Sequence, residues 1–203
     1  LTDDGEHYYS YAIGGNSGKS DSLPQAKPIG EWMEDSHKFF LIREDKRSVE
    51  TMSIVKNLST PRPKLRTYKF AMPGDTGVIQ YDAYIVDADS SKIYDVDLAK
   101  YPDQEIETPR FSGYVKTKDY IYFIRRPRTN EVVELCRVNI HNHQVSTIIS
   151  DNCSPRLNEQ LFNYKLINKE KEILWWSERS GKGSYYLYSK DGELKNKVTP
   201  EKF

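Results

Sequence analysis

The sequence predicts an all-β fold, a partial β-propeller of about four blades, and three observations support this prediction. Short segments rich in Val, Ile, Tyr, Phe and Trp follow one another along the chain, each bounded by Gly, Pro, Asn or Asp. Long stretches with the 3.6-residue period of an amphipathic helix are scarce. A strand–turn–strand unit recurs at an interval of about 50 residues, which is typical of propeller blades.

Six segments have the length and composition of strands. The chain has 15 Tyr against 7 Phe and 3 Trp, and Tyr suits half-buried strands because the ring packs while the hydroxyl reaches water or a carbonyl. The expected strands cover residues 38–43, 82–86, 120–125, 131–140, 172–176 and 184–189. The Asp-Gly pair at 191–192 predicts a tight hairpin turn after the last of them.

The spacing of equivalent residues supports the repeat. Arg125 lies 52 residues before Ser177, and Cys136 lies 51 residues before Leu187. Each pair occupies the same place in an apolar strand followed by a polar turn. Two successive blades therefore share one design.

The earlier part of the chain is less regular, because only 32 residues separate Met52 from Tyr84. Residues 1–2 and 198–199 both look like the close of an outer strand. We therefore expect residues 1–203 to form one propeller segment, a single domain that is a fragment of a larger propeller. A β-sandwich, with even strand spacing and no long repeat, is the alternative.

Charge and hydropathy exclude some classes of function. Lys and Arg number 30 and Asp and Glu number 30, so the net charge is zero and no long-range positive field attracts nucleic acid or an anionic membrane. The basic cluster at 125–128, Arg-Arg-Pro-Arg, is expected to be a solvated strand end and loop. No apolar run approaches the roughly 20 residues that span a bilayer, and no signal peptide opens the chain.

Two cysteines leave two alternatives open. Cys136 lies in an apolar strand pattern and Cys153 in the loop that follows. They either form a disulfide in an oxidising compartment or remain free thiols, with Cys136 as a small core residue.

Two motifs, a phosphate-binding loop and a nucleophile elbow, are incomplete in this sequence. The stretch Gly-Gly-Asn-Ser-Gly-Lys-Ser at 14–20 lacks the first glycine of a phosphate-binding loop, because that position holds Ile13. Two prolines shortly after it prevent the helix that such a loop opens. The Gly-Asn-Ser-Gly part also fails as a nucleophile elbow, since Lys19 stands where a glycine is required. A flexible loop between blades explains the composition.

No residues suggest a metal, a cofactor or a catalytic group. His141 and His143 flank Asn142 in an expected hairpin turn without a carboxylate cluster beside them. The acidic residues lack the spacing of a calcium loop, and we expect them to be solvent-facing strand positions; they are Asp87, Asp89, Asp95, Asp97 and Asp103. Without a nucleophile, a base and an orienting acid, this chain alone has no basis for acyl transfer.

Three segments, in the right order and together spanning most of the chain, resemble the dipeptidyl peptidase IV family of serine peptidases. Residues 175–188 are similar to that family's Trp-Ser-Glu-Arg-x-Gly turn and the aromatic strand ending in Leu-Tyr. Residues 61–75 resemble its Tyr-x-x-x-x-Pro-Gly-Asp stretch, which leads into Tyr-x-Val-Asp at 84–87. The segment that begins at Trp32 is similar to the start of a blade. The overall character resembles bacterial, Bacteroidetes-like members.

The resemblance implies the propeller of an exopeptidase whose separate C-terminal α/β-hydrolase domain supplies Ser, Asp and His. The propeller would gate access and position peptide substrates, and the parent protein would be a periplasmic or secreted serine dipeptidyl peptidase or aminopeptidase. The hydrolase domain is absent from this chain, and the paired glutamates that hold a substrate's amine are not recognisable in it. Arg156 lies near the place of a family arginine that contacts substrate.

Other readings remain beside this one. The chain is alternatively a stand-alone propeller module that binds protein or glycan, or an unrelated β-domain. An open arc of blades would expose faces that neighbouring blades normally bury, so we also expect self-association.

Overall fold

The computed structural model describes residues 5–11, 30–33, 37–107 and 117–199. These described residues form strands and turns and contain no helix. A helix long and apolar enough to cross a membrane is therefore not found among them. The chain falls into two compact units, one of residues 1–32 and 37–95 and the other of residues 33–36 and 96–203. Each unit is considered by itself below.

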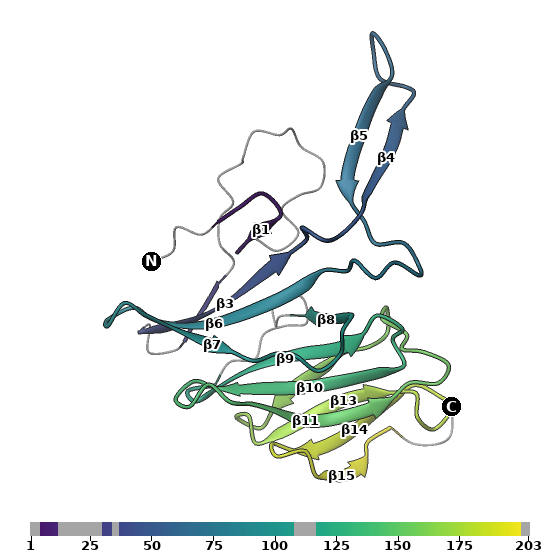
Figure 1. Ribbon diagram of the computed structural model, residues 1–203. Coiled ribbons are helices and arrows are strands. Elements are labelled where there is room, and N and C mark those ends of the chain that lie inside the picture. Colours follow the sequence, from purple (N-terminus) through teal and green to yellow (C-terminus); the bar gives the residue numbers. More distant parts are fainter. Residues whose placement is uncertain (1–4, 12–29, 34–36, 108–116, 200–203) are drawn as a thin grey trace. The chain divides into compact units, whose positions relative to one another are not determined.

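The sheet of the first unit has four strand positions (Figure 1), and its first position is filled by two short strands. Both β1 and β2 pair with the same edge of β3. The strand β1 pairs with the last residues of β3, and β2 pairs with residues in the middle of β3. On the other side β3 pairs with β6 along its whole length, and β7 follows β6. The strands of this sheet are β1 (Tyr9–Ser10), β2 (Gly30–Trp32), β3 (Lys38–Asp45), β6 (Gln80–Asp87) and β7 (Lys92–Val96).

Two arginines, Arg43 in β3 and Arg47 in the turn that follows β3, hold β1 in place. The guanidinium of Arg43 lies 3.8 Å from the centre of the Tyr9 ring, and that of Arg47 lies 3.9 Å from it. Arg43 also donates a hydrogen bond to the hydroxyl of Tyr84 on β6. Cation–π contacts of this kind contribute about 0.5–2 kcal/mol each. They compensate for the short pairing of a two-residue strand.

A hairpin projects from the sheet of the first unit between β3 and β6. It consists of β4 (Thr51–Lys56) and β5 (Lys64–Lys69), which pair with each other and with no other described strand. Figure 1 shows it extending away from the sheet of its own unit. This hairpin explains why the sequence spacing in the first part of the chain is irregular.

The second unit contains two four-stranded antiparallel sheets, each a meander whose neighbours in space are neighbours in sequence. The first sheet consists of β8 (Gln104–Glu107), β9 (Tyr120–Pro127), β10 (Val132–Asn139) and β11 (Val145–Asn152). The second consists of β12 (Tyr164–Ile167), β13 (Glu172–Ser177), β14 (Ser184–Ser189) and β15 (Leu194–Lys197). This is the strand order of a propeller blade.

One apolar core joins the two sheets of the second unit. Trp175 on β13 is fully buried and packs with side chains from β9 to β14. The other members of this core are Tyr122, Ile124, Val133, Leu135, Ile149, Leu157, Tyr164, Ile173, Tyr186 and Tyr188. Four of the eleven are tyrosines, which are half apolar and half polar and suit strands packed face to face.

A close approach between the two sheets requires a glycine. Gly192, in the turn between β14 and β15, has a φ of +90°, and a Cβ built there would lie 2.0 Å from the carbonyl oxygen of Ile148 on β11. Only glycine tolerates both the left-handed backbone and the contact. The Asp-Gly turn predicted at 191–192 is therefore confirmed.

The structure confirms the all-β prediction and each of the six expected strands, which correspond to β3, β6, β9, β10, β13 and β14. It corrects the prediction for the basic cluster at 125–128. Arg125 and Arg126 are 5% and 6% exposed rather than solvated, because β9 is a central strand and both side chains form ion pairs. That residues 1–203 form a single domain stays a prediction.

Candidate functional site

The loop between β11 and β12 carries Arg156, the one substrate-binding residue expected from the sequence. The backbone N–H of Cys153 donates to the carbonyl of Glu131 at 2.7 Å, and that of Leu157 donates to the carbonyl of Asn130 at 2.7 Å. The Leu157 side chain is buried in the core of the second unit. Anchors on both sides of Arg156 hold this loop against the turn between β9 and β10.

The side chain of Arg156 is exposed. Among the described residues it has no hydrogen-bond or ion-pair partner. A guanidinium presents five N–H donors in a fixed plane and stays charged at every physiological pH. Arg156 is therefore a cation on an anchored loop, and it is able to bind a carbonyl or carboxylate oxygen.

Three carboxylates surround a second arginine close to this loop. The Arg126 Nη2 atom lies 2.8 Å from Glu105, 2.7 Å from Glu107 and 3.3 Å from Glu159. Burial raises the pKa of the Glu107 carboxyl, although Arg126 opposes that rise. Glu159 belongs to the same loop as Arg156 and also accepts a hydrogen bond from Asn130 at 2.6 Å.

Sequence reasoning missed this carboxylate cluster, but a signal for it exists. In the stretch Gln104–Glu107 apolar or buried positions alternate with glutamates, as in a half-buried strand. The alternation places Glu105 and Glu107 on one side of β8. What the sequence does not reveal is that Arg126, on the neighbouring strand, lies between them.

The Trp-Ser-Glu-Arg segment has a structural role in the described part of the chain. The Arg179 guanidinium lies 3.0 Å from the carboxylate of Asp151, which also accepts a hydrogen bond from the Trp175 indole at 2.9 Å. The Ser177 hydroxyl accepts hydrogen bonds from the Arg179 backbone N–H at 3.1 Å and from its Nε at 3.0 Å. Asp151 is nearly buried. The motif thus closes the turn after β13 and ties it to β11 of the other sheet.

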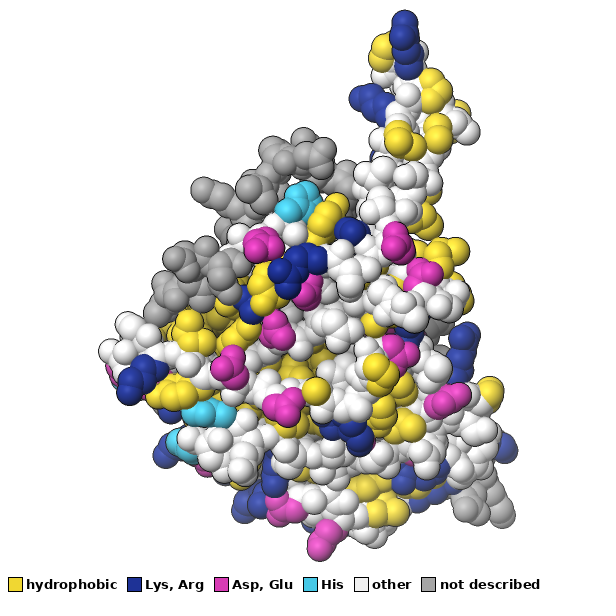
Figure 2. Space-filling view, viewed as in Figure 1, with side chains coloured by type: hydrophobic (Ala, Val, Ile, Leu, Met, Phe, Trp, Pro, Cys, Tyr) yellow, Lys and Arg dark blue, Asp and Glu magenta, His cyan; other side chains and the backbone are white. Residues whose placement is uncertain are grey.

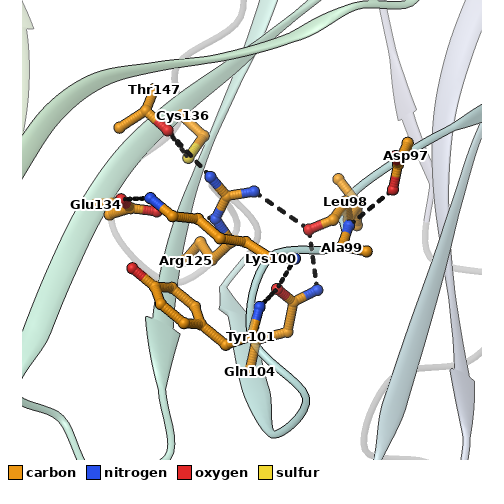
Figure 3. A network of polar contacts seen from close by, with 10 residues as sticks. All are labelled: Asp97, Leu98, Ala99, Lys100, Tyr101, Gln104, Arg125, Glu134, Cys136 and Thr147. Carbon is orange, nitrogen blue, oxygen red and sulfur yellow. Dashed lines mark hydrogen bonds and ion pairs between the residues drawn. The ribbon is translucent and has the colours of Figure 1, made fainter.

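A second buried network fixes the segment that leads into β8 (Figure 3). Glu134 on β10 is fully buried. It accepts a hydrogen bond from Arg125 Nε at 2.9 Å and another from the ammonium of Lys100. Arg125 donates in addition to the carbonyl of Leu98 at 3.2 Å and to the hydroxyl of Thr147 at 3.0 Å. The charges are satisfied within the network, so we assign it to folding rather than to binding.

The two cysteines are free thiols, which decides between the alternatives that the sequence left open. Cys136 is fully buried, and burial raises the pKa of its thiol to about 11. Burial likewise raises the pKa of Cys153 to about 11. Both thiols are therefore protonated at neutral pH and are poor nucleophiles.

The remaining motifs occupy ordinary positions or lie outside the described residues. The glycine-rich stretch at 14–20, with its incomplete nucleophile elbow, lies outside them. His141 lies in a turn, as predicted, with its Nε2 atom 3.0 Å from Asp119. The five aspartates at 87–103 are exposed or partly exposed, but only Asp87 and Asp95 lie in strands. In the described ranges, no group of three His, Cys, Asp or Glu side chains is placed to hold a metal ion.

Comparisons with solved structures show the same fold. A crystal structure of Porphyromonas gingivalis dipeptidyl peptidase 4 superposes with a TM-score of 0.68 at 17% identity, over 86% of this chain and 24% of that chain. A putative dipeptidyl aminopeptidase IV from Bacteroides ovatus superposes with a TM-score of 0.61 at 15% identity, over 80% of this chain and 22% of that one. The chain thus spans about a quarter of the length of these relatives.

Comparisons of the sequence give the family. A search of curated proteins finds no match. A family profile described as the dipeptidyl peptidase IV (DPP IV) N-terminal region matches residues 26–203, which include every strand from β2 to β15. This match agrees with the partial propeller of antiparallel sheets and with the two bacterial dipeptidyl peptidase structures. The chain belongs to the family of dipeptidyl peptidase IV N-terminal regions.

Proposed function

We propose that this chain is the non-catalytic propeller portion of a dipeptidyl-peptidase-IV-like serine exopeptidase. In this role it gates and positions peptide substrates for a separate α/β-hydrolase domain, which carries the nucleophile. Family membership is the observation that carries the proposal. A periplasmic or secreted location fits the same proposal.

Arg156 is the residue that we propose for substrate binding. Its loop is held by backbone hydrogen bonds at Cys153 and Leu157, so the guanidinium is positioned without losing much loop freedom on binding. Among the described residues no carboxylate neutralises it. A peptide carbonyl oxygen is a suitable acceptor, since hydrogen bonds to a charged group contribute about 1.5–3 kcal/mol.

The experiment measures hydrolysis of an aminoacyl-prolyl chromogenic substrate by the full-length protein and by its Arg156→Ala variant. We expect KM to rise by about tenfold or more with little change in kcat, since the contact is made in the ground state and the transition state alike. Lys165→Ala, which removes an exposed cation elsewhere in the second unit, is the matched control and leaves KM unchanged. An unchanged KM in Arg156→Ala would remove this residue from the proposal.

The parent reading frame tests the larger claim. We expect it to encode a Gly-x-Ser-x-Gly nucleophile elbow downstream of this segment. A frame that continues only into further blades, or ends soon after residue 203, would instead favour a stand-alone module that binds protein or glycan. The isolated chain should not turn over the chromogenic substrate, and measurable turnover would contradict a non-catalytic role.

A further inference from the structure

Asn130, in the turn between β9 and β10, forms two hydrogen bonds to the loop that carries Arg156. Its backbone carbonyl accepts from the N–H of Leu157 at 2.7 Å, and its side-chain Nδ2 donates to the carboxylate of Glu159 at 2.6 Å. Leu157 and Glu159 follow Arg156 by one and three positions. One residue of a neighbouring turn therefore holds the chain just after Arg156 through both its backbone and its side chain.

The conformation of Asn130 is unfavourable in two respects. Its φ is +59°, in the left-handed region that side chains other than glycine seldom adopt, although asparagine tolerates it better than most. Its Oδ1 atom is buried and has no hydrogen-bond partner among the described residues, which is uncommon for a buried acceptor. The opposite orientation of the amide would place Oδ1 against the Glu159 carboxylate, and two acceptors cannot bond to each other. The contact with Glu159 therefore decides how the amide lies.

Glu159 is also held from a second direction. Its carboxylate lies 3.3 Å from Nη2 of Arg126, a buried residue of β9. Arg126 forms further ion pairs with Glu105 and Glu107 on the neighbouring strand β8. The turn that contains Asn130 is itself closed, because the backbone N–H of Asn130 donates to the carbonyl of Pro127 at 2.9 Å. The loop is thus tied through Glu159 to the sheet of β8 to β11 on both sides of this carboxylate.

We propose that Asn130 is a positioning residue, which together with Glu159 keeps the guanidinium of Arg156 where a peptide oxygen reaches it. This inference rests on the proposed role of Arg156 in substrate binding. On the face drawn in Figure 2, acidic and basic side chains are interspersed over the second unit, so on that face local geometry rather than a field of one sign places a ligand. A guanidinium that occupies the binding position for only a fraction of the time binds more weakly by that fraction.

The first experiment measures hydrolysis of the aminoacyl-prolyl chromogenic substrate by the full-length protein and its Asn130→Gly variant. Glycine keeps the left-handed backbone and the carbonyl acceptor but removes the amide that holds Glu159. We expect KM to rise about three- to tenfold with kcat unchanged, because only the position of Arg156 is affected. In an Arg156→Ala background the same substitution should change KM by less than about twofold, because no guanidinium remains to be positioned.

A rescue variant tests the hydrogen bond itself. Asn130→Asp tolerates the same backbone but places one carboxylate against another, so KM should rise at least as much as in Asn130→Gly. In the double variant Asn130→Asp/Glu159→Gln the donor and the acceptor are exchanged, since the new glutamine amide donates to the new carboxylate. KM should then return to within about twofold of the parental value. A general loss of stability would not be repaired by this exchange.

The chain offers a closely matched control. Asn168, in the turn between β12 and β13, has a φ of +52° and also donates its Nδ2 to a glutamate, Glu172. It follows β12, whereas the loop of Arg156 precedes that strand, so Asn168→Gly should leave KM unchanged. Hydrogen exchange in the 203-residue chain gives a second reading that needs no catalysis. The amide of Leu157 should exchange at least about tenfold faster in Asn130→Gly and at the parental rate in Asn168→Gly.

Three results would overturn the positioning role of Asn130. They are an unchanged KM in Asn130→Gly while Arg156→Ala raises KM, an equal rise of KM in the presence and the absence of Arg156, and an unchanged exchange rate of the Leu157 amide. An unchanged KM in Arg156→Ala would instead overturn the proposed substrate contact itself. The exchange rate of Leu157 would still decide whether Asn130 holds the loop, so the two failures are distinguishable.

Discussion

Replacing Glu134 by Gln removes one charge from a place that water does not reach, and it should cost more stability than any other single change in its network. Glu134 is 0% exposed and lies between two cations with different surroundings. The Arg125 side chain is 6% exposed, whereas that of Lys100 is 42% exposed. After the substitution Lys100 can turn toward water, but Arg125 remains buried without a counter-charge.

The structure sets the size of the effect. Removing one partner of a buried ion pair typically costs 3–5 kcal/mol. Arg125 keeps its hydrogen bonds to Leu98 and Thr147, and the new amide oxygen still accepts from Nε, so we expect the low end, about 3 kcal/mol. Lys100→Met leaves the Arg125–Glu134 pair intact and, as a half-exposed contact, should cost about 1 kcal/mol or less.

Urea unfolding measures both effects as shifts of the midpoint at constant slope. The double variant Glu134→Leu/Arg125→Met is the control for packing, since replacing both charges by apolar groups of similar size is often neutral. It should therefore be more stable than Glu134→Gln. An equal loss of stability in Lys100→Met and Glu134→Gln, or a loss below about 1 kcal/mol in Glu134→Gln, would contradict a buried Arg125 that depends on the Glu134 charge.

Three further predictions follow from single residues. Gly192→Ala should lower the stability clearly more than Gly181→Ala in thermal unfolding, because both positions have positive φ but only at 192 would the added Cβ lie 2.0 Å from a backbone carbonyl oxygen. Strain alone costs about 1–2 kcal/mol, and equal losses would contradict the close approach. Cys136 should resist Ellman's reagent at about pH 8 until the chain unfolds. Burial raises the pKa of Cys136 to about 11. The buried neutral thiol therefore contributes its full share to the stability of the fold below the ordinary thiol pKa, and this contribution is lost as pH rises through the raised value. Rapid labelling of Cys136 in the native chain would contradict its burial. The Arg47 side chain donates a hydrogen bond that lowers the pKa of Asp45. That contact stabilises the fold above the ordinary carboxyl range and is lost as pH falls through the lowered pKa of Asp45, so Arg47→Gln should raise that pKa in an NMR titration.

The strands of the second unit were predictable because each has a buried face and clear ends. In β13 and β14 aromatic and β-branched residues form short runs, and Gly181 and Gly192 mark the turns that follow them with positive φ. These local signals agree with the tertiary packing, since residues of the apolar runs fill the shared core. The repeat of about 50 residues then gave the blade architecture.

The hairpin of the first unit was not predictable in the same way. Periodicity detects a strand through the face that it buries, and neither face of β4 and β5 is buried. Val55 and Leu65 lie on one face, while Ile54 and Arg66 lie on the other. The sequence of residues 51–69 therefore shows no periodic apolar pattern, although Thr, Ile, Val and Tyr give it ordinary strand propensity.

The buried arginines show a further limit of a single sequence. From the sequence Arg125 and Arg126 were predicted to be a solvated basic cluster, because charged residues are seldom buried without a partner. The partner of Arg125 is Glu134, directly opposite on β10, so pairing the two predicted strands into a hairpin would have found it. The partners of Arg126 are on β8 and in the loop before β12, and these contacts depend on the fold of the whole unit.

Charge pairing separates structural cations from candidate binding cations in this chain. Arg125, Arg126 and Arg179 each have a carboxylate of their own unit within 3.3 Å. That neutralisation accounts for the burial of Arg125 and Arg126 and leaves all three arginines little capacity for a ligand. Arg156 is equally basic in the sequence, yet no described residue pairs with its side chain. Backbone hydrogen bonds at Cys153 and Leu157 anchor its loop, so the guanidinium is held in place while its N–H donors remain available to an external acceptor. The combination of an unpaired guanidinium and an anchored loop is therefore what singles out Arg156 as the cation that we expect to contact a peptide.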